Sequence, residues 1–218
     1  MKTHPYIIWD WNGTLIDDVN AAVNALNRML AARGVPPTTR DFYRAHFGFP
    51  VRPFYTRVGL DLEREDWDRI CTDFHRFIGE EPDQHLRTDA LEALRHVRAG
   101  GGRQSILSAL RQDLLRRDTA REGVQPFFDE IYGVDNLDGA TKLSRGHDLA
   151  ARLAETGVLK ENSPLFFIGD TLHDAEVGAA LGATPILVEG GHQNGDRLRT
   201  AGCAVAPSLL AAVRHVLA

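Results

Sequence analysis

The feature that most constrains the fold is the segment 6–15, which reads YIIWDWNGTL. Four apolar residues of high strand propensity end at Asp10, and the turn pair Asn12-Gly13 follows after one residue. This pattern indicates a buried strand that stops at a turn. Asp10 would then lie at the carboxyl end of a strand, where open α/β sheets bind their ligands. Taken alone, the pattern favours Asp10 as a residue that caps the turn rather than as a nucleophile. The rest of the chain reverses this preference.

Beyond residue 86, strand patterns alternate with helix patterns. We expect helices between strands at residues 104–107, within 127–134, and at 165–168, 184–188 and 204–205, the last a short edge strand. Such alternation predicts a parallel sheet that helices cover on both faces.

The segment 17–86 interrupts this alternation. It contains helical patterns and no strand pattern, and Asp17 or Asp18 would cap its first helix. We therefore predict an α/β fold with two domains. Residues 1–16 and 87–218 would form the α/β core domain, and residues 17–86 would form an inserted all-helical cap domain.

The composition narrows the function. The chain has 218 residues, of which 43% are hydrophobic and 25% charged, as in ordinary soluble proteins. A formal net charge of -5 without a basic block argues against nucleic-acid binding. No apolar run approaches the ~20 residues needed to span a membrane. The first expected strand begins close to the N-terminus and leaves no room for a signal peptide, so we expect a cytoplasmic location. We also expect the protein to be a monomer or a homodimer.

Polar residues suited to chemistry follow several of the expected strands. Asp10, Ser108 and Asp170 each end a strand, Lys142 follows the loop after another, and Asp174 lies one helical turn beyond Asp170. The carboxyl ends of parallel strands meet at one edge of a sheet. Because groups of complementary charge would gather there, Asp10 is better interpreted as a nucleophile than as a turn cap.

Oxygen ligands in this set predict a magnesium site. Mg²⁺ prefers six oxygen ligands and often takes one or two carboxylates together with water and substrate phosphate. Asp10, Asp170 and the backbone carbonyl of Asn12 would supply them. Asp174 would steady the metal shell or bind through water.

The remaining members of the set are suited to a phosphoryl group. Lys142 and the hydroxyl of Ser108 would hold phosphoryl oxygens, and a surface lysine at a helix start is the weaker alternative for Lys142. Phosphoryl transfer needs mainly positioning and neutralisation of negative charge. Asp10 would then attack phosphorus and form an aspartyl-phosphate.

With these motifs the chain resembles the haloacid dehalogenase superfamily hydrolases that carry a helical cap, of the phosphoglycolate-phosphatase-like kind. The resemblance covers essentially the whole chain. It implies a Rossmann-like core, Mg²⁺ as cofactor, Asp10 as nucleophile, phosphate contacts from the Gly13-Thr14 turn, and a cap that closes over a small phosphorylated substrate. The matching residues, in the order typical of the family, are Asp10-x-Asn12-Gly13-Thr14-Leu15, Ser108, Lys142 and Gly169-Asp170-x-x-x-Asp174.

Asn12 departs from the pattern of the family. Its phosphatases usually carry an aspartate at this position, which protonates the leaving alcohol and later activates water. An amide cannot do this, so a contribution of roughly 10²–10⁴-fold is in question. Three interpretations stay open: another group or a metal-bound water serves instead, the leaving group needs no acid, or the protein is a catalytically weakened binding protein. His173 and His46 are the candidate substitutes. We favour an active phosphatase.

Two further points concern specificity and alternative activities. Arg52, in the aromatic segment 47–55, would bind a substrate carboxylate, although a surface arginine is at least as good an interpretation.

Phosphonate cleavage would need a cap lysine, and residues 17–86 contain none. A sugar-phosphate mutase would need the proton shuttle that Asn12 lacks, and metal-free dehalogenation does not fit the paired acids.

Overall fold

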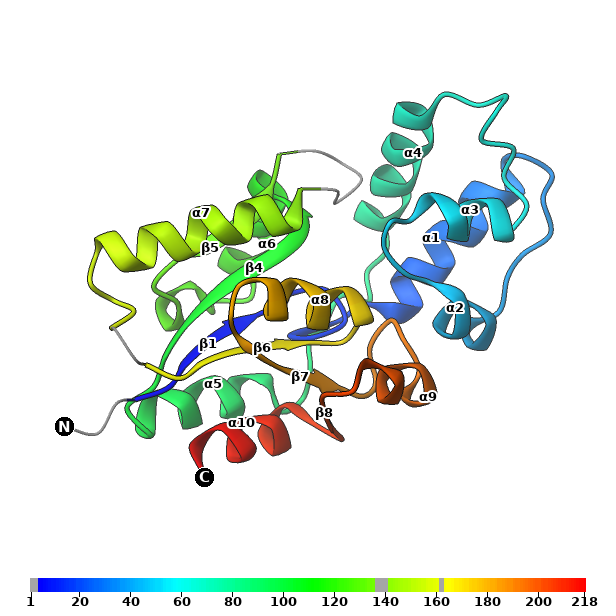
Figure 1. Ribbon diagram of the computed structural model, residues 1–218. Helices are drawn as coiled ribbons and strands as arrows, with labels where there is room; N and C mark the ends of the chain where they lie inside the picture. Colours follow the sequence, from blue (N-terminus) through cyan, green and yellow to red (C-terminus); the bar gives the residue numbers. More distant parts are fainter. Residues whose placement is uncertain (1–3, 136–140, 161–162) are drawn as a thin grey trace.

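A six-stranded parallel sheet forms the centre of the computed structural model, which describes residues 4–135, 141–160 and 163–218 (Figure 1). Its order is β5-β4-β1-β6-β7-β8, and every neighbouring pair is parallel. The predicted α/β class is thereby confirmed. The strands are β1 (Tyr6–Trp9), β4 (Arg103–Arg111), β5 (Ile131–Val134), β6 (Leu165–Gly169), β7 (Thr184–Val188) and β8 (Ala204–Ala206).

Helices cover both faces of this sheet, and the alternation of side chains along β1 shows why. Ile7 and Trp9 belong to the hydrophobic cluster shared with α5 (Ala90–Ala99) and α10 (Leu209–Leu217). Tyr6 and Ile8 belong to another cluster. Successive side chains of a strand point to opposite faces, so a fully apolar strand fits the middle of a covered sheet. The other face carries α7 (Lys142–Glu155) and α8 (Leu172–Ala180), while α6 (Gln112–Arg121) lies along β4 and β5.

Strand β4 is longer than the sequence pattern indicated. It does not stop at Ser108 but bulges there: between the pairs Leu107–Tyr132 and Arg111–Val134, β4 advances four residues while β5 advances two. The hydroxyl oxygen of Ser108 accepts a hydrogen bond from the backbone N–H of Leu110 at 3.1 Å. The expected end of the strand is therefore a bulge, where the chain leaves the ladder and rejoins it.

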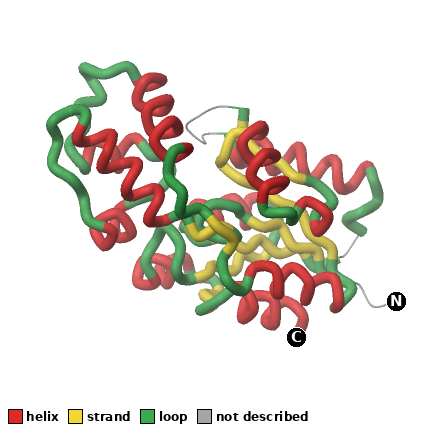
Figure 2. The backbone as a smooth tube through the Cα atoms, turned by 180° about the vertical axis from the view of Figure 1, so that it is seen from behind, coloured by secondary structure: helices red, strands yellow, loops and turns green. Residues whose placement is uncertain are grey.

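The inserted segment folds into helices α1 (Val19–Ala31), α2 (Arg40–His46), α3 (Arg52–Arg57) and α4 (Trp67–Gly79), which share one hydrophobic cluster of their own. We call these four helices and their connections the cap. Figure 2 shows the cap set to one side of the sheet and joined to it by loops. The exact division into core and cap domains stays a prediction.

A short ribbon joins the two connections between cap and sheet. Strand β2 (Ile16–Asp17) pairs antiparallel with β3 (His85–Leu86), at the two ends of the segment expected to be entirely helical. Two-residue strands are too short to produce a recognisable alternation, which explains why the sequence pattern did not reveal them. The remaining elements are the short helices η1 (Gln125–Phe127), α9 (Gly195–Leu198) and η2 (Arg199–Ala201). Within the described ranges, no helix has the length and apolar character to cross a bilayer.

Candidate active site

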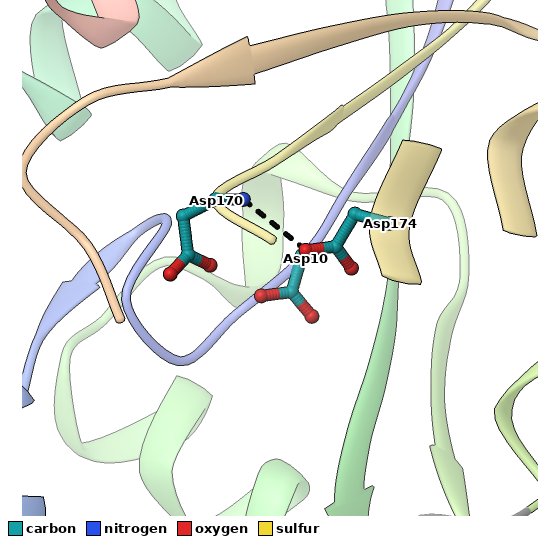
Figure 3. Close-up of side chains that lie close together, drawn as sticks. All are labelled: Asp10, Asp170 and Asp174. Carbon is teal, nitrogen blue, oxygen red and sulfur yellow. Dashed lines mark hydrogen bonds between the residues drawn. The ribbon is translucent and has the colours of Figure 1, made fainter. Parts of the chain in front are cut away.

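Three carboxylates meet at the edge of the sheet that faces the cap (Figure 3). Asp10 follows β1, Asp170 follows β6, and Asp174 lies in the first turn of α8. One oxygen from each lies within 4.8 Å of those of the other two, and all three side chains are buried. The backbone N–H of Asp10 donates to the carbonyl of Ile168 at 2.9 Å, which fixes the two strand ends side by side. The structure thus brings together the acids that the sequence placed on separate strands.

Asp174 is held by a capping box at the start of α8. Its Oδ2 accepts hydrogen bonds from the N–H and the hydroxyl of Thr171, at 2.9 and 2.7 Å, and from the N–H of Asp170 at 3.2 Å. Its Oδ1 remains directed at Lys142, 2.5 Å from Nζ. The helix terminus therefore orients one oxygen and leaves the other to the site.

Lys142 is buried between two of the acids, which excludes the surface interpretation. Its Nζ lies 2.6 Å from Asp10 Oδ1 as well as 2.5 Å from Asp174 Oδ1, and the residue is 2% exposed. Burial alone would lower the pKa of Lys142, but the charges and hydrogen bonds of Asp10 and Asp174 raise it above its usual range. Lys142 is therefore a permanent positive charge beside the expected nucleophile.

The charge of this cluster calls for a further cation. Burial raises the pKa of Asp10 above its ordinary value, Lys142 opposes this, and the carboxylates of Asp174 and Asp170 add to it. Burial also raises the pKa of Asp170, to about 6. Lys142 pairs with two of these three carboxylates, so a divalent ion bound by oxygen would offset the excess negative charge. The donor set fits Mg²⁺.

The turn after Asp10 fits closely against Asp170 and leaves no space for a side chain at Gly13. The φ of Gly13 is 73°, and a Cβ there would lie 2.3 Å from Asp170 Oδ2. Thr14 is fully buried, and its hydroxyl lies 3.2 Å from Asp10 Oδ2 and 2.9 Å from Asp170 Oδ1. In this structure Thr14 therefore connects two carboxylates, and its expected contact with phosphate stays a prediction.

Asn12 contacts Asp18, an acid that the sequence pattern predicted to cap a helix. Its amide Nδ2 donates to Asp18 Oδ2 at 2.7 Å, and the N–H of Gly13 donates to Asp18 Oδ1 at 2.8 Å. Asp18 occupies the N-cap position of α1, but its side chain makes no capping hydrogen bond. The carboxylate expected to cap a helix instead fixes the turn that follows the nucleophile.

The loop after β7, which the sequence pattern indicated only as a loop and not as part of a site, contacts the acids. The N–H of His192 donates to Asp170 Oδ2 at 2.6 Å, and its Nε2 lies 3.2 Å from Asp18 Oδ1. His192 Nδ1 also lies 3.0 Å from the hydroxyl of Tyr43 on α2, so this loop contacts the cap. A Gly-Gly pair directly after a strand at the same sheet edge was the signal available in the sequence. At Gly191 a Cβ would lie 2.2 Å from Asp170 Oδ2.

The other proposed specificity and proton-transfer residues do not join the cluster. Arg52 is exposed on α3, with its guanidinium 4.4 Å from the ring centre of Trp67. His46 Nδ1 lies 2.9 Å from the carbonyl of Phe42. His173 lies beside Phe49, with the ring centres 5.2 Å apart. None of Arg52, His46 and His173 is among the described residues that line the cavity over the acids.

That cavity has a volume of about 180 Å³ and lies between the sheet edge and the cap. Its floor contains the three acids with Lys142 and Ser108, and Asn12 and Asp18 lie at its side. Ser108 is buried and its hydroxyl proton is not used in the bond from Leu110, so it can donate to a ligand. These predicted site residues therefore line one cavity.

A parallel α/β sheet with paired acids at its carboxyl edge and a helical insertion after the first strand defines a capped hydrolase of the Rossmann-like type. The sequence profile of the haloacid dehalogenase-like hydrolases matches residues 7–188, and the chain belongs to that family. This confirms the resemblance stated from the motifs.

Several known proteins are similar to this chain. A phosphoglycolate phosphatase of Caulobacter vibrioides is 28% identical over 199 residues, which cover 85% of this chain and 79% of that protein. The tyrosine-protein kinase PtkA of Mycobacterium tuberculosis is 25% identical over 198 residues, covering 87% of this chain and 64% of PtkA. The chain thus spans just under two thirds of that second relative.

Solved structures show the same fold. The structure of PtkA from Mycobacterium tuberculosis superimposes with a TM-score of 0.79 at 21% identity and covers 99% of both chains. A haloacid dehalogenase-like hydrolase family protein from Streptococcus pneumoniae gives a TM-score of 0.72 at 19% identity, again over 99% of both chains. These structures show the shared fold, and the family match together with the phosphoglycolate phosphatase relative supports the predicted enzyme class, a phosphoric monoester hydrolase.

Proposed function

We propose that this protein is a magnesium-dependent phosphatase that hydrolyses a small phosphate monoester through an aspartyl-phosphate on Asp10, in the manner expected of phosphoglycolate-phosphatase-like hydrolases. The observation that carries the proposal is the position of Asp10. Its carboxylate is buried at a strand end, 2.6 Å from a lysine and within 4.8 Å of two further acids, at the floor of a cavity. That arrangement suits a nucleophile facing a dianion.

The metal would be held by Asp10, Asp170 and the backbone carbonyl of Asn12, with Asp174 supporting the shell. When bound, Mg²⁺ supplies neutralisation of the charge on the phosphoryl oxygens. Asp170 is fixed for this role by the hydroxyl of Thr14 and the N–H of His192. Its carboxylate is therefore oriented before any ligand binds.

The protein's own residues account for the transfer. A carboxylate oxygen of Asp10 forms a bond to phosphorus while the bond from phosphorus to the leaving oxygen breaks and its electron pair departs with that oxygen. Lys142 and Ser108 hold the phosphoryl oxygens in line for this exchange. Water then cleaves the aspartyl-phosphate, which releases inorganic phosphate and restores Asp10.

A second candidate function follows from Asn12. Its amide is bound to Asp18 and cannot transfer a proton, which favours a catalytically weakened protein that binds phosphorylated ligands. Phosphonate cleavage stays the least favoured alternative, because the cap has no lysine to form a Schiff base.

Phosphate release from a panel of small phosphate esters, with Mg²⁺ and after its removal by chelation, tests the proposal. We expect turnover that requires Mg²⁺ and that Asp10→Asn abolishes. Asp196→Asn is the matched control, because Asp196 is exposed and pairs with Arg199 away from the site. Ligand binding without any phosphate release would favour the binding protein, and release that Asp10→Asn leaves intact would refute the assigned nucleophile.

A further inference from the structure

The cap side of the cavity is aromatic. The cap lies beside the carboxyl ends of the strands (Figure 1), and it contributes six aromatic rings to the lining. Several of these rings pack on one another: Phe47 and Phe49 meet edge to face with centres 5.6 Å apart, and Tyr43 and Phe54 do so at 5.4 Å. The six residues are Tyr43, Phe47, Phe49, Phe54, Tyr55 and Phe74.

The same wall lacks a strong cation. Among the described residues of the cap that line the cavity, none is lysine or arginine. Several arginines of the cap have partners outside the cavity: Arg33 pairs with Glu65 and Asp73, and Arg44 donates to the carbonyl of Gly191 at 2.8 Å. The basic groups described near this wall are His75 of the cap and, from the core, His192, which already lies 3.2 Å from Asp18 Oδ1. A second anionic group on the substrate would therefore be buried largely against aromatic rings, which is unfavourable.

One arginine lines the cavity from the core side. Arg117, on α6, donates to Asp118 at 3.0 Å, and its side chain is 61% exposed. It lies in solvent and is already paired with an acid, so it is poorly suited to bind a buried carboxylate.

Asn12 restricts the leaving group independently. Without a proton donor at this position, the leaving oxygen has to depart as an anion. A phenol has a pKa of about 10, as for tyrosine, whereas that of water, which simple alcohols resemble, is about 15.7. An aromatic hydroxyl is thus the leaving group that needs an acid least.

Both features favour the same kind of substrate. We propose that the site takes aryl phosphates: the phosphate of a phenol-like hydroxyl would lie over Asp10 and Lys142, and its ring would contact the aromatic wall of the cap. The inference rests on the proposed phosphatase function. In the step, the Asp10 oxygen bonds to phosphorus, the bond from phosphorus to the aryl oxygen breaks, and the phenolate carries away the electron pair.

The kinetic test compares three substrates at saturating Mg²⁺: phenyl phosphate, benzyl phosphate and 2-phosphoglycolate. Benzyl phosphate keeps the ring but has an alcohol as leaving group. We expect kcat/KM for phenyl phosphate to exceed that for 2-phosphoglycolate by about 100-fold or more, because the acid normally contributes at least that much. Benzyl phosphate should bind like phenyl phosphate but give a lower kcat/KM, because the leaving group acts only in the transfer to Asp10. Equal or faster turnover of 2-phosphoglycolate would overturn the inference and leave the phosphatase function intact.

If no ester is hydrolysed, the phosphatase function is refuted, but the preference for an aromatic ring can still be tested by binding. Calorimetry with Mg²⁺ compares phenylphosphonate with phosphonoacetate, which carries a carboxylate in place of the ring. We expect phenylphosphonate to bind more tightly. Phe74→Leu should reduce that preference by about three- to tenfold, the typical contribution of an aromatic contact.

Phe42→Leu serves as the matched control in the binding test, because Phe42 is a 37% exposed cap phenylalanine outside the lining. It should leave the preference unchanged. Tighter binding of phosphonoacetate, or equal effects of the two substitutions, would contradict the proposed ring site.

Discussion

The two sides of the cavity differ in how their side chains are held. On the sheet side, the buried charge of Lys142 lies within 2.6 Å of both Asp10 and Asp174, and Asp170 accepts two hydrogen bonds. On the cap side, the lining is mainly aromatic rings that contact one another. Charged groups in a low-dielectric setting interact strongly and tolerate little displacement, whereas apolar contacts depend mainly on area. We infer that the sheet side fixes the chemistry and the cap side selects the substrate.

Removing the cation from the sheet side should have the largest effect. Lys142→Ala would leave Asp10 and Asp174 buried without their shared partner, and breaking a buried ion pair this way costs about 3–5 kcal/mol. Thermal unfolding should show that loss, and turnover should fall by about 10³-fold. Lys160→Ala, at an exposed lysine, is the control. If Lys142→Ala were as stable as the control, the described ion pairs would not stabilise the fold.

Restoring the missing acid should remove the restriction on the leaving group. Asn12→Asp would place a second carboxylate at the 2.7 Å contact with Asp18, and two carboxylates this close favour sharing one proton. We expect kcat/KM for alkyl phosphates to rise about 10²-fold and that for phenyl phosphate to change little. The double variant Asn12→Asp, Asp18→Asn keeps the charge count and serves as a second test. An unchanged or lower rate on alkyl phosphates in steady-state assays would show that our account of the missing acid is wrong.

Adding one methyl group at Gly13, in the turn after Asp10, should weaken Mg²⁺ binding. Gly13→Ala and Gly34→Ala both place a side chain at a positive φ, of 73° and 68°, which costs about 1–3 kcal/mol. Only at Gly13 does the new Cβ meet Asp170; around Gly34 there is no atom within 4 Å. Calorimetric Mg²⁺ affinity should therefore drop about 10- to 100-fold in Gly13→Ala alone. Equal Mg²⁺ affinities in the two variants would show that Asp170 does not contribute to metal binding.

The smallest expected effect is a shift in thermal stability when Mg²⁺ binds. At 100 times its dissociation constant a ligand stabilises the folded state by about 2.7 kcal/mol, which corresponds to roughly 5–10 °C for a chain of this size. Differential scanning calorimetry should show this shift in the wild type and a much smaller one in Asp170→Asn. The same shift in both proteins would place the ion elsewhere.

The sequence predicted the sheet side of the site better than the cap side. Asp10, Asp170 and Asp174 could be placed together because the ends of parallel strands share an edge, a rule that needs no knowledge of side-chain packing. The parallel sheet followed from the alternation of strand and helix patterns. The predicted sheet and helical insertion both appear in the structure.

What the sequence could not provide depends on contacts between distant segments. Arg52 appeared suited to a substrate carboxylate, but its stacking on Trp67 is set by how α3 packs on α4. His192 lies 149 residues from its partner Tyr43, so no local pattern relates them. Asp18 matched a helix cap, and only the folded turn shows that its carboxylate holds Asn12 instead.

The ribbon of β2 and β3 has a mechanical consequence. Both crossings between cap and sheet are tied together there, through the pair of Ile16 with Leu86 and the bond from the N–H of Arg87 to the carbonyl of Leu15. The cap also contacts the loop after β7, where Arg44 donates to the carbonyl of Gly191, so a rotation of the cap about the ribbon would have to break that contact. Asp18 directly follows β2 and accepts hydrogen bonds from Asn12 and Gly13. A rotation of the cap would therefore displace the turn that follows Asp10.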